Sequence, residues 1–174
     1  RFDSDAFTAS PSKLYYGLKE LSTKADKQDD LLVQDFASLE NTDDDHVTPL
    51  SEAEKEVKYS FFKKWIGEAL ETINGLDADK FSGAIAYLLL SLSYRIDYMI
   101  APEGKLLNRL EKITTIYFRK DERPVTEKNR DMTEEYRKLG ELSKEEVIGY
   151  LFRSKYTFSI VAPQPYKTIS DSIH

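Results

Sequence analysis

Hydrophobic residues recur along most of the chain at the three- and four-residue spacing of amphipathic helices. The clearest stripe runs over 57–73. It follows Ser51 and Glu54, which have the spacing of a capping box, in which each side chain satisfies a free backbone N–H of the first turn. Gly75 comes directly after the stripe, and glycine readily adopts the left-handed conformation that closes helices. These features predict a helix from Ser51 to about residue 74.

The next segment predicts the centre of the fold. A second helix is expected over about 78–100, and its Ala84–Leu92 portion is apolar nearly all round. A helix of this kind is typical of a position covered on most sides. Pro102 separates it from another amphipathic helix at about Glu103–Lys120, whose leucines are expected to face the core.

The N-terminal third begins with a helix signal and ends in an acidic run. Ser10 is suited to the N-cap, and Pro11 to the first helical position, where its missing N–H is tolerated. Apolar residues then continue at helical spacing on both sides of a polar stretch, so we expect two helices or one bent helix to about Glu40. The segment 41–49 is acidic and has no periodicity, which predicts a loop.

The C-terminal part predicts two short helices and one strand. After a charged connector at 121–129, a helix is expected at about Met132–Leu139, stopped by Gly140, and another after the capping box of Ser143 and Glu146. Segment 156–161 is β-branched and aromatic with alternation, which predicts a strand. A strand needs a partner, which we expect to be segment 2–8, segment 166–173 or another chain.

Taken together, these patterns predict a mainly α fold. We expect a bundle of four to seven helices around the central apolar helix at about 78–100, with a short C-terminal β element. Residues 1–121 are predicted to form the bundle core, with the acidic loop at 41–49. Residues 122–174 are predicted to form a smaller helix-turn-helix-strand segment packed on the same domain.

Composition removes several classes of chemistry. The chain has no cysteine, which excludes disulfides and thiolate nucleophiles, and it has two histidines and seven glycines. No phosphate-binding glycine motif, nucleophile elbow or zinc-protease motif occurs. The run Asp43–His46 is interpreted as a solvated loop, because adjacent side chains do not converge on one ion. We therefore expect no cofactor and no metal site.

The lengths of the apolar runs indicate whether the chain can span a membrane. The longest uninterrupted apolar run covers 84–90, whereas a membrane-spanning helix needs roughly 20 apolar residues. No Asn-x-Ser/Thr acceptor occurs either. We expect no membrane span and a cytoplasmic or nucleoplasmic protein.

The charge distribution singles out one helix face. The net charge is −6, but residues 103–156 carry eleven acids and thirteen bases. On a helix at 103–120, four cations fall within about 80° of arc over about 21 Å. Two further cations extend this row if the helix lasts that far. The row, called the basic row below, consists of Lys105, Arg109, Lys112, Arg119, Lys120 and Arg123. It would suit a phosphate backbone or an acidic partner, and an ordinary solvated face is the alternative.

Arg95 and Asp97 form an unusual charged pair near the end of the most apolar helix. Two positions apart, they point in nearly opposite directions and cannot pair directly. One interpretation is a buried charge that serves a site or an interface. The other is that the helix reaches solvent after Leu92 and the stem of Arg95 lies over apolar neighbours.

These observations favour a non-catalytic helical module that binds another protein chain or itself, as a subunit or adaptor of a larger assembly. The first alternative is a nucleic-acid-associated subunit that contacts phosphates through the basic row. The second alternative is an enzyme that uses carboxylates alone, because acidic residues are abundant but their spacing singles out no catalytic pair.

Overall fold

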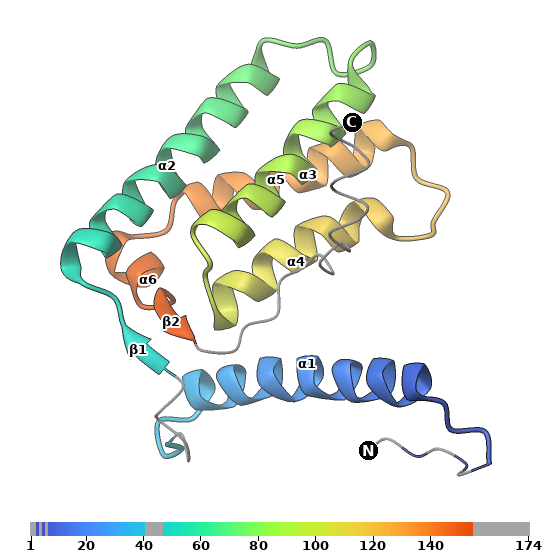
Figure 1. Ribbon diagram of the computed structural model, residues 1–174. Coiled ribbons are helices and arrows are strands. Elements are labelled where there is room, and N and C mark those ends of the chain that lie inside the picture. Colours follow the sequence, from blue (N-terminus) through green and yellow to red (C-terminus); the bar gives the residue numbers. More distant parts are fainter. Residues whose placement is uncertain (1–2, 4, 6, 41–46, 155–174) are drawn as a thin grey trace, which may run out of the picture. The chain divides into compact units, whose positions relative to one another are not determined.

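The computed structural model describes residues 3, 5, 7–40 and 47–154 of the chain (Figure 1). These described residues contain six helices and one two-stranded antiparallel sheet, and the helices pack against each other. The predicted mainly α fold class is therefore confirmed. The chain divides into two units, Arg1–Asp45 and His46–His174.

The first unit is built on one long helix, α1, which spans Pro11–Asp35. The side chain of Ser10 accepts a hydrogen bond from the Lys13 N–H, and Pro11 occupies the first turn, as the sequence predicts. The helix is continuous through the polar stretch in its middle, so it is neither two helices nor an extension to Glu40. It ends where Phe36 adopts an extended backbone.

The second unit opens with α2, which spans Glu52–Asn74. Ser51 caps it by accepting from the Glu54 N–H, but the Glu54 carboxylate accepts from Arg153 and does not complete the predicted capping box. The left-handed cap predicted at Gly75 is also wrong, because its φ is −87°. The Gly75 N–H bonds the Thr72 carbonyl instead, so the chain leaves the helix through a tight right-handed turn.

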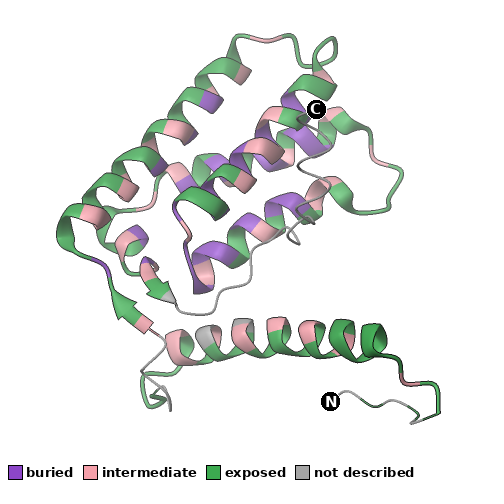
Figure 2. Cartoon of the chain, viewed as in Figure 1, coloured by how far each residue is buried: buried purple, intermediate pink, exposed green. Residues whose placement is uncertain are grey.

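Helix α3 spans Ser82–Met99 and is the central helix expected from the sequence. It starts later than predicted because the Asp77 carboxylate accepts from two backbone N–H groups, at residues 79 and 80, and holds a turn there. Helices α2, α4 and α5 pack against it, and Figure 2 shows both buried and exposed residues along it. Tyr87 and Tyr98 are among the exposed ones. In the segment 84–92, Ala84 and Tyr87 are exposed and the other residues are buried or half-buried, so the expected cover on most sides of this segment is confirmed.

Helix α4 spans Gly104–Phe118, and α5 spans Val125–Gly140. The leucines of α4 face the core, as predicted. The start of α5 at Val125 contradicts the connector predicted at 121–129. Part of the buried face of α5 is polar there, and hydrogen bonds satisfy it. Lys128 Nζ donates to the carbonyls of Tyr117 and Arg119, at 3.3 and 2.7 Å, and thereby caps the C-terminal end of α4.

The core lies among α2, α3, α4 and α5, and each of these helices contributes buried apolar side chains to it. Its fully buried members include Phe62, Leu89, Ile96, Leu110 and Tyr136. The Tyr136 hydroxyl lies 2.5 Å from Ser93 Oγ and donates to the Leu89 carbonyl at 3.0 Å. Burial raises the pKa of Tyr136 well above the ordinary tyrosine value, so this phenol stays neutral and hydrogen-bonded.

The chain then forms the short helix α6, Lys144–Ile148, which opens with the complete capping box of Ser143 and Glu146 that the sequence predicts. Strand β2, Phe152–Ser154, follows and pairs antiparallel with β1, Val47–Pro49. The end of the predicted loop at 41–49 is therefore a strand, because pairing with a distant segment supplies its hydrogen bonds. The strand predicted at 156–161 lies outside the described residues.

None of the helices in the described part of the chain is both long enough and apolar enough to cross a membrane.

Candidate interaction surface

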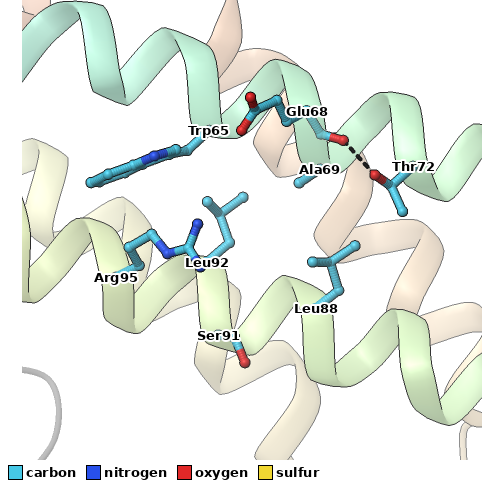
Figure 3. A pocket seen from close by; sticks show the side chains of 8 residues that line it. All are labelled: Trp65, Glu68, Ala69, Thr72, Leu88, Ser91, Leu92 and Arg95. Atoms are coloured by element: carbon cyan, nitrogen blue, oxygen red, sulfur yellow. Dashed lines mark hydrogen bonds between the residues drawn. The ribbon is translucent and has the colours of Figure 1, made fainter.

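A groove of about 160 Å³ lies between α2 and α3 (Figure 3). Each helix contributes four side chains to its lining. Those of α2 are Trp65, Glu68, Ala69 and Thr72, and those of α3 are Leu88, Ser91, Leu92 and Arg95. The groove is therefore formed wholly within the second unit and on its most regular elements.

The groove has an apolar floor and a polar rim. Ala69 and Leu92 are buried at its base, and Leu88 is half-buried beside them. Glu68 and Thr72 are exposed at the rim, where the Thr72 hydroxyl donates to the Glu68 carbonyl at 2.7 Å (Figure 3). A small apolar depression edged by polar groups is the usual form of a site that takes one side chain or a small ligand.

Arg95 lies across one end of the groove. Its guanidinium carbon is 5.4 Å from the centroid of the Trp65 ring, which is a cation–π contact (Figure 3). Arg95 is exposed, so the interpretation in which its stem crosses apolar neighbours at the surface is the one the structure favours. Asp97 is buried, and the two charged residues thus serve different sides of α3.

The electrostatics of the groove are set by one cation and one carboxylate. Glu68 pairs with Lys64 of its own helix, at 3.9 Å. Within the described ranges, no carboxylate lies within ion-pair distance of Arg95, whose contact is the Trp65 ring. The guanidinium N–H groups are therefore available to an acidic group brought by a partner.

Exposed apolar side chains lie on the first half of α2 and at the end of α3. Lys58 Nζ donates to the Ile100 carbonyl at 2.8 Å, so this part of α2 runs beside the end of α3. Phe61 is partly exposed, and its ring centroid lies 5.3 Å from that of Trp65. Met99, one helical turn after Arg95, is also exposed. Val57 and Tyr98 are exposed apolar side chains of the same two segments.

The basic row is interrupted in the structure. Helix α4 ends at Phe118, so Arg119 is its C-cap residue and Lys120 lies beyond the helix. Lys105 is half-buried, whereas Arg109 is exposed. The predicted continuous stripe along one helix therefore covers only the first three cations, and the last three follow a different backbone path.

Ion pairs engage Lys112 and Arg123 of the basic row. The Lys112 ammonium lies 3.3 Å from a carboxylate oxygen of Glu135. The pKa of the Glu135 carboxyl is lowered, mainly by a hydrogen bond from Lys138 and also by the one from Lys112. Arg123 binds Asp121 at 3.1 Å and Asp131 at 2.6 Å, and these hydrogen bonds raise the pKa of Arg123. Part of the positive charge of the row is thus balanced within the chain.

Metal ligation finds no support in the parts described. No group of three or more histidine, aspartate or glutamate side chains there is arranged to hold an ion. The acidic residues Asp43–His46, interpreted above as a solvated loop, lie outside the described residues.

Sequence reasoning singled out Arg95 but missed the rest of the groove. Trp65 and Leu88 lie within the apolar patterns of 57–73 and 84–92, which are typical of core-facing residues. One signal was present: Val57, Phe61 and Trp65 form a second apolar row beside the buried row of α2. A stripe wider than one core face indicates that part of it serves another contact.

Comparisons with protein-family models, with curated proteins and with solved structures find no match to this chain. Its function is therefore inferred from the chemistry of its own surfaces.

Proposed function

We propose that this chain is a non-catalytic helical module that binds another protein chain through the groove between α2 and α3. The observation that carries the proposal is the groove's volume of about 160 Å³ with an apolar floor. A cavity of about 150 Å³ holds a benzene-sized group, so this one has room for a single leucine or phenylalanine side chain. Binding of one buried anchor surrounded by weaker contacts is how most protein interfaces are organised.

The surroundings of the groove indicate the chemistry of the partner. Arg95 at the rim would pair with an aspartate or glutamate close to the anchor. Met99 and Phe61 would accept a second apolar side chain about one helical turn, or roughly 6 Å, further along. An amphipathic helix with apolar residues three or four positions apart and a neighbouring acid meets both requirements.

The two alternatives have weaker support. Phosphate contact through the basic row would have to overcome internal ion pairs at Lys112 and Arg123 and a net charge of −6. Catalysis by carboxylates needs two placed groups, whereas the groove is lined by the single carboxylate of Glu68, which pairs with Lys64.

The proposal can be tested by selecting peptides from a displayed random library against the wild-type chain. We expect enriched sequences to share a leucine, phenylalanine or tryptophan with an aspartate or glutamate within one helical turn. Leu88→Glu, which places a charge in the groove, should weaken binding of these peptides at least tenfold. Arg95→Glu should reverse the preference and enrich lysine or arginine beside the anchor.

Tyr87→Glu is the matched control, because Tyr87 is an exposed neighbour of Leu88 that does not line the groove. This variant should bind the selected peptides as the wild type does, and circular dichroism should show all three variants folded at the temperature of the binding measurement. Selection of no peptide, or of peptides that bind the Leu88→Glu and wild-type chains equally, would overturn the proposal. Salt-dependent binding of a nucleic acid that charge reversal at Arg109 and Lys112 abolishes would favour the nucleic-acid alternative.

A further inference from the structure

Helix α1 carries a heptad pattern on one face. Six positions alternate four and three residues apart, which is the a/d spacing of a coiled coil. They are Leu14, Leu18, Leu21, Ala25, Gln28 and Leu32. All but Gln28 are apolar, so this seam is a continuous apolar row with one polar residue near its C-terminal end.

The seam is accessible along its length. Leu18 and Leu32 are 54% and 45% exposed, and Leu14 and Leu21 are exposed as well. Leucine at three- and four-residue spacing on a 25-residue helix amounts to a large apolar stripe. In proteins most of the stability of a helix comes from the packing of its apolar face against another surface. We therefore expect another apolar surface of similar length to pack against the seam.

We propose that the seam of α1 pairs with the seam of a second copy of this chain, parallel and in register, as a short two-stranded coiled coil. This surface is separate from the groove between α2 and α3, so the inference does not depend on the proposed function. A second copy is the partner favoured here because the seam is complementary to itself: leucine meets leucine, and Ala25 meets Ala25.

Gln28 favours the parallel arrangement. In register, the two Gln28 amides face each other across the seam, and each can donate to the other. An antiparallel pair centred on the helix, at residue 23, would set Gln28 against Leu18. The amide would then be buried without a partner, which costs roughly 1–3 kcal/mol.

Flanking charges favour the same arrangement. Lys24 and Asp29 occupy the positions beside the seam that meet between the helices of a parallel pair, where charges of opposite sign set partner and orientation. Lys24 also binds Glu20 of its own helix at 2.6 Å, on the side away from the seam. Exposed ion pairs contribute little free energy, so these charges select the orientation while the leucines supply the attraction.

The absence of cysteine from the sequence allows a direct test, because a single introduced cysteine has no competitor. Gln28→Cys places one thiol in each seam at equivalent positions, and mild oxidation of the full chain should link most of it into dimers. Glu20→Cys is the matched control, since Glu20 is exposed and outside the seam. It should form dimers at least tenfold more slowly.

Light scattering on the full chain gives a second measurement. The wild type should change from the mass of one chain to the mass of two as concentration rises, and Leu18→Glu should stay at one. Equal crosslinking of the two cysteine variants, or a wild type with the mass of one chain throughout, would overturn the inference. Crosslinking of Leu18→Cys with Gln28→Cys, in place of Gln28→Cys with itself, would overturn the parallel arrangement.

Leu18→Glu should also bind the selected peptides as tightly as the wild type, because the groove is in the other unit. Loss of self-association with retained peptide binding, or the reverse, therefore tells failure of one proposal from failure of the other.

Discussion

Helices α1 and α4 have similar patterns of leucine but different surroundings. In α4, Leu106 and Leu110 are 0% exposed. In α1, Leu18 is 54% exposed, although the spacing of its leucines is equally regular. The comparison shows that periodicity tells which face of a helix must be covered, while the tertiary structure decides whether the chain itself supplies the cover.

The largest expected effect is the difference in stability between leucine-to-alanine substitutions in α4 and in α1. Leu110→Ala removes a fully buried side chain and should lower the free energy of unfolding by about 2–5 kcal/mol. Leu18→Ala should change it by less than about 0.5 kcal/mol at concentrations where the chain is monomeric. Urea unfolding followed by tryptophan fluorescence measures this directly, since the single tryptophan, Trp65, lies in the second unit. An equal shift from both substitutions would contradict the separation into two units.

The next comparison is between a buried and an exposed lysine of the second unit. Lys128 is buried and donates to two carbonyls at the end of α4, so Lys128→Met should lower the free energy of unfolding by about 2–3 kcal/mol. Lys112 is exposed on the basic row, and Lys112→Met should change it by less than about 0.5 kcal/mol. The same urea experiment decides the matter. If Lys128→Met is as mild as Lys112→Met, then hydrogen bonding does not explain why α5 begins at Val125.

Lys128 should also affect how the free energy of unfolding depends on pH. A hydrogen bond from Lys128, foremost, holds the pKa of Asp121 below its ordinary range. A carboxyl with a lowered pKa stabilises the fold above its unfolded pKa, about 4, and this contribution is lost as the pH falls further. Stability of the wild type should therefore fall between about pH 5 and pH 3, and that fall should be smaller in Lys128→Met.

The turn between α3 and α4 carries the smallest expected effects, and they have opposite signs. Ala101 has a φ of 49°, and Gly104 has a φ of 58°. Because the left-handed region is unfavourable for residues with a Cβ, Ala101→Gly should stabilise the second unit by up to about 1 kcal/mol. Gly104→Ala should destabilise it by about 1–2 kcal/mol. Thermal unfolding of the two variants would show whether the melting temperatures move in opposite directions.

Local signals in the sequence predicted local structure well. Ser10, Ser51 and Ser143 were each predicted to cap a helix, and each does so by accepting from a backbone N–H three residues on. The start of α5 was missed because Lys128 and Asn129 are polar yet buried. Their burial depends on carbonyls of α4 and α3, which no pattern within residues 121–129 reveals.

The candidate site was less predictable than the fold. The exposed position of Arg95 was one of two interpretations of the sequence, but its contact with Trp65 depends on how α2 lies against α3. The helix that carries the basic row was predicted to continue to about Lys120, but α4 ends at Phe118. The sequence has no glycine or proline there to indicate this end. Lys128 donates to the carbonyls of Tyr117 and Arg119, on either side of that point, which again is a contact that the local sequence does not reveal.

Amide hydrogen exchange of the full chain, measured residue by residue at several protein concentrations, tests the central comparison most directly. We expect amides of α3 and α4 to exchange slowly at every concentration, because their opening requires unfolding of the core. Amides of α1 should exchange fast in dilute solution and become protected as the concentration rises and its seam is covered. Slow exchange in α1 that matches α3 and does not vary with concentration would contradict this account.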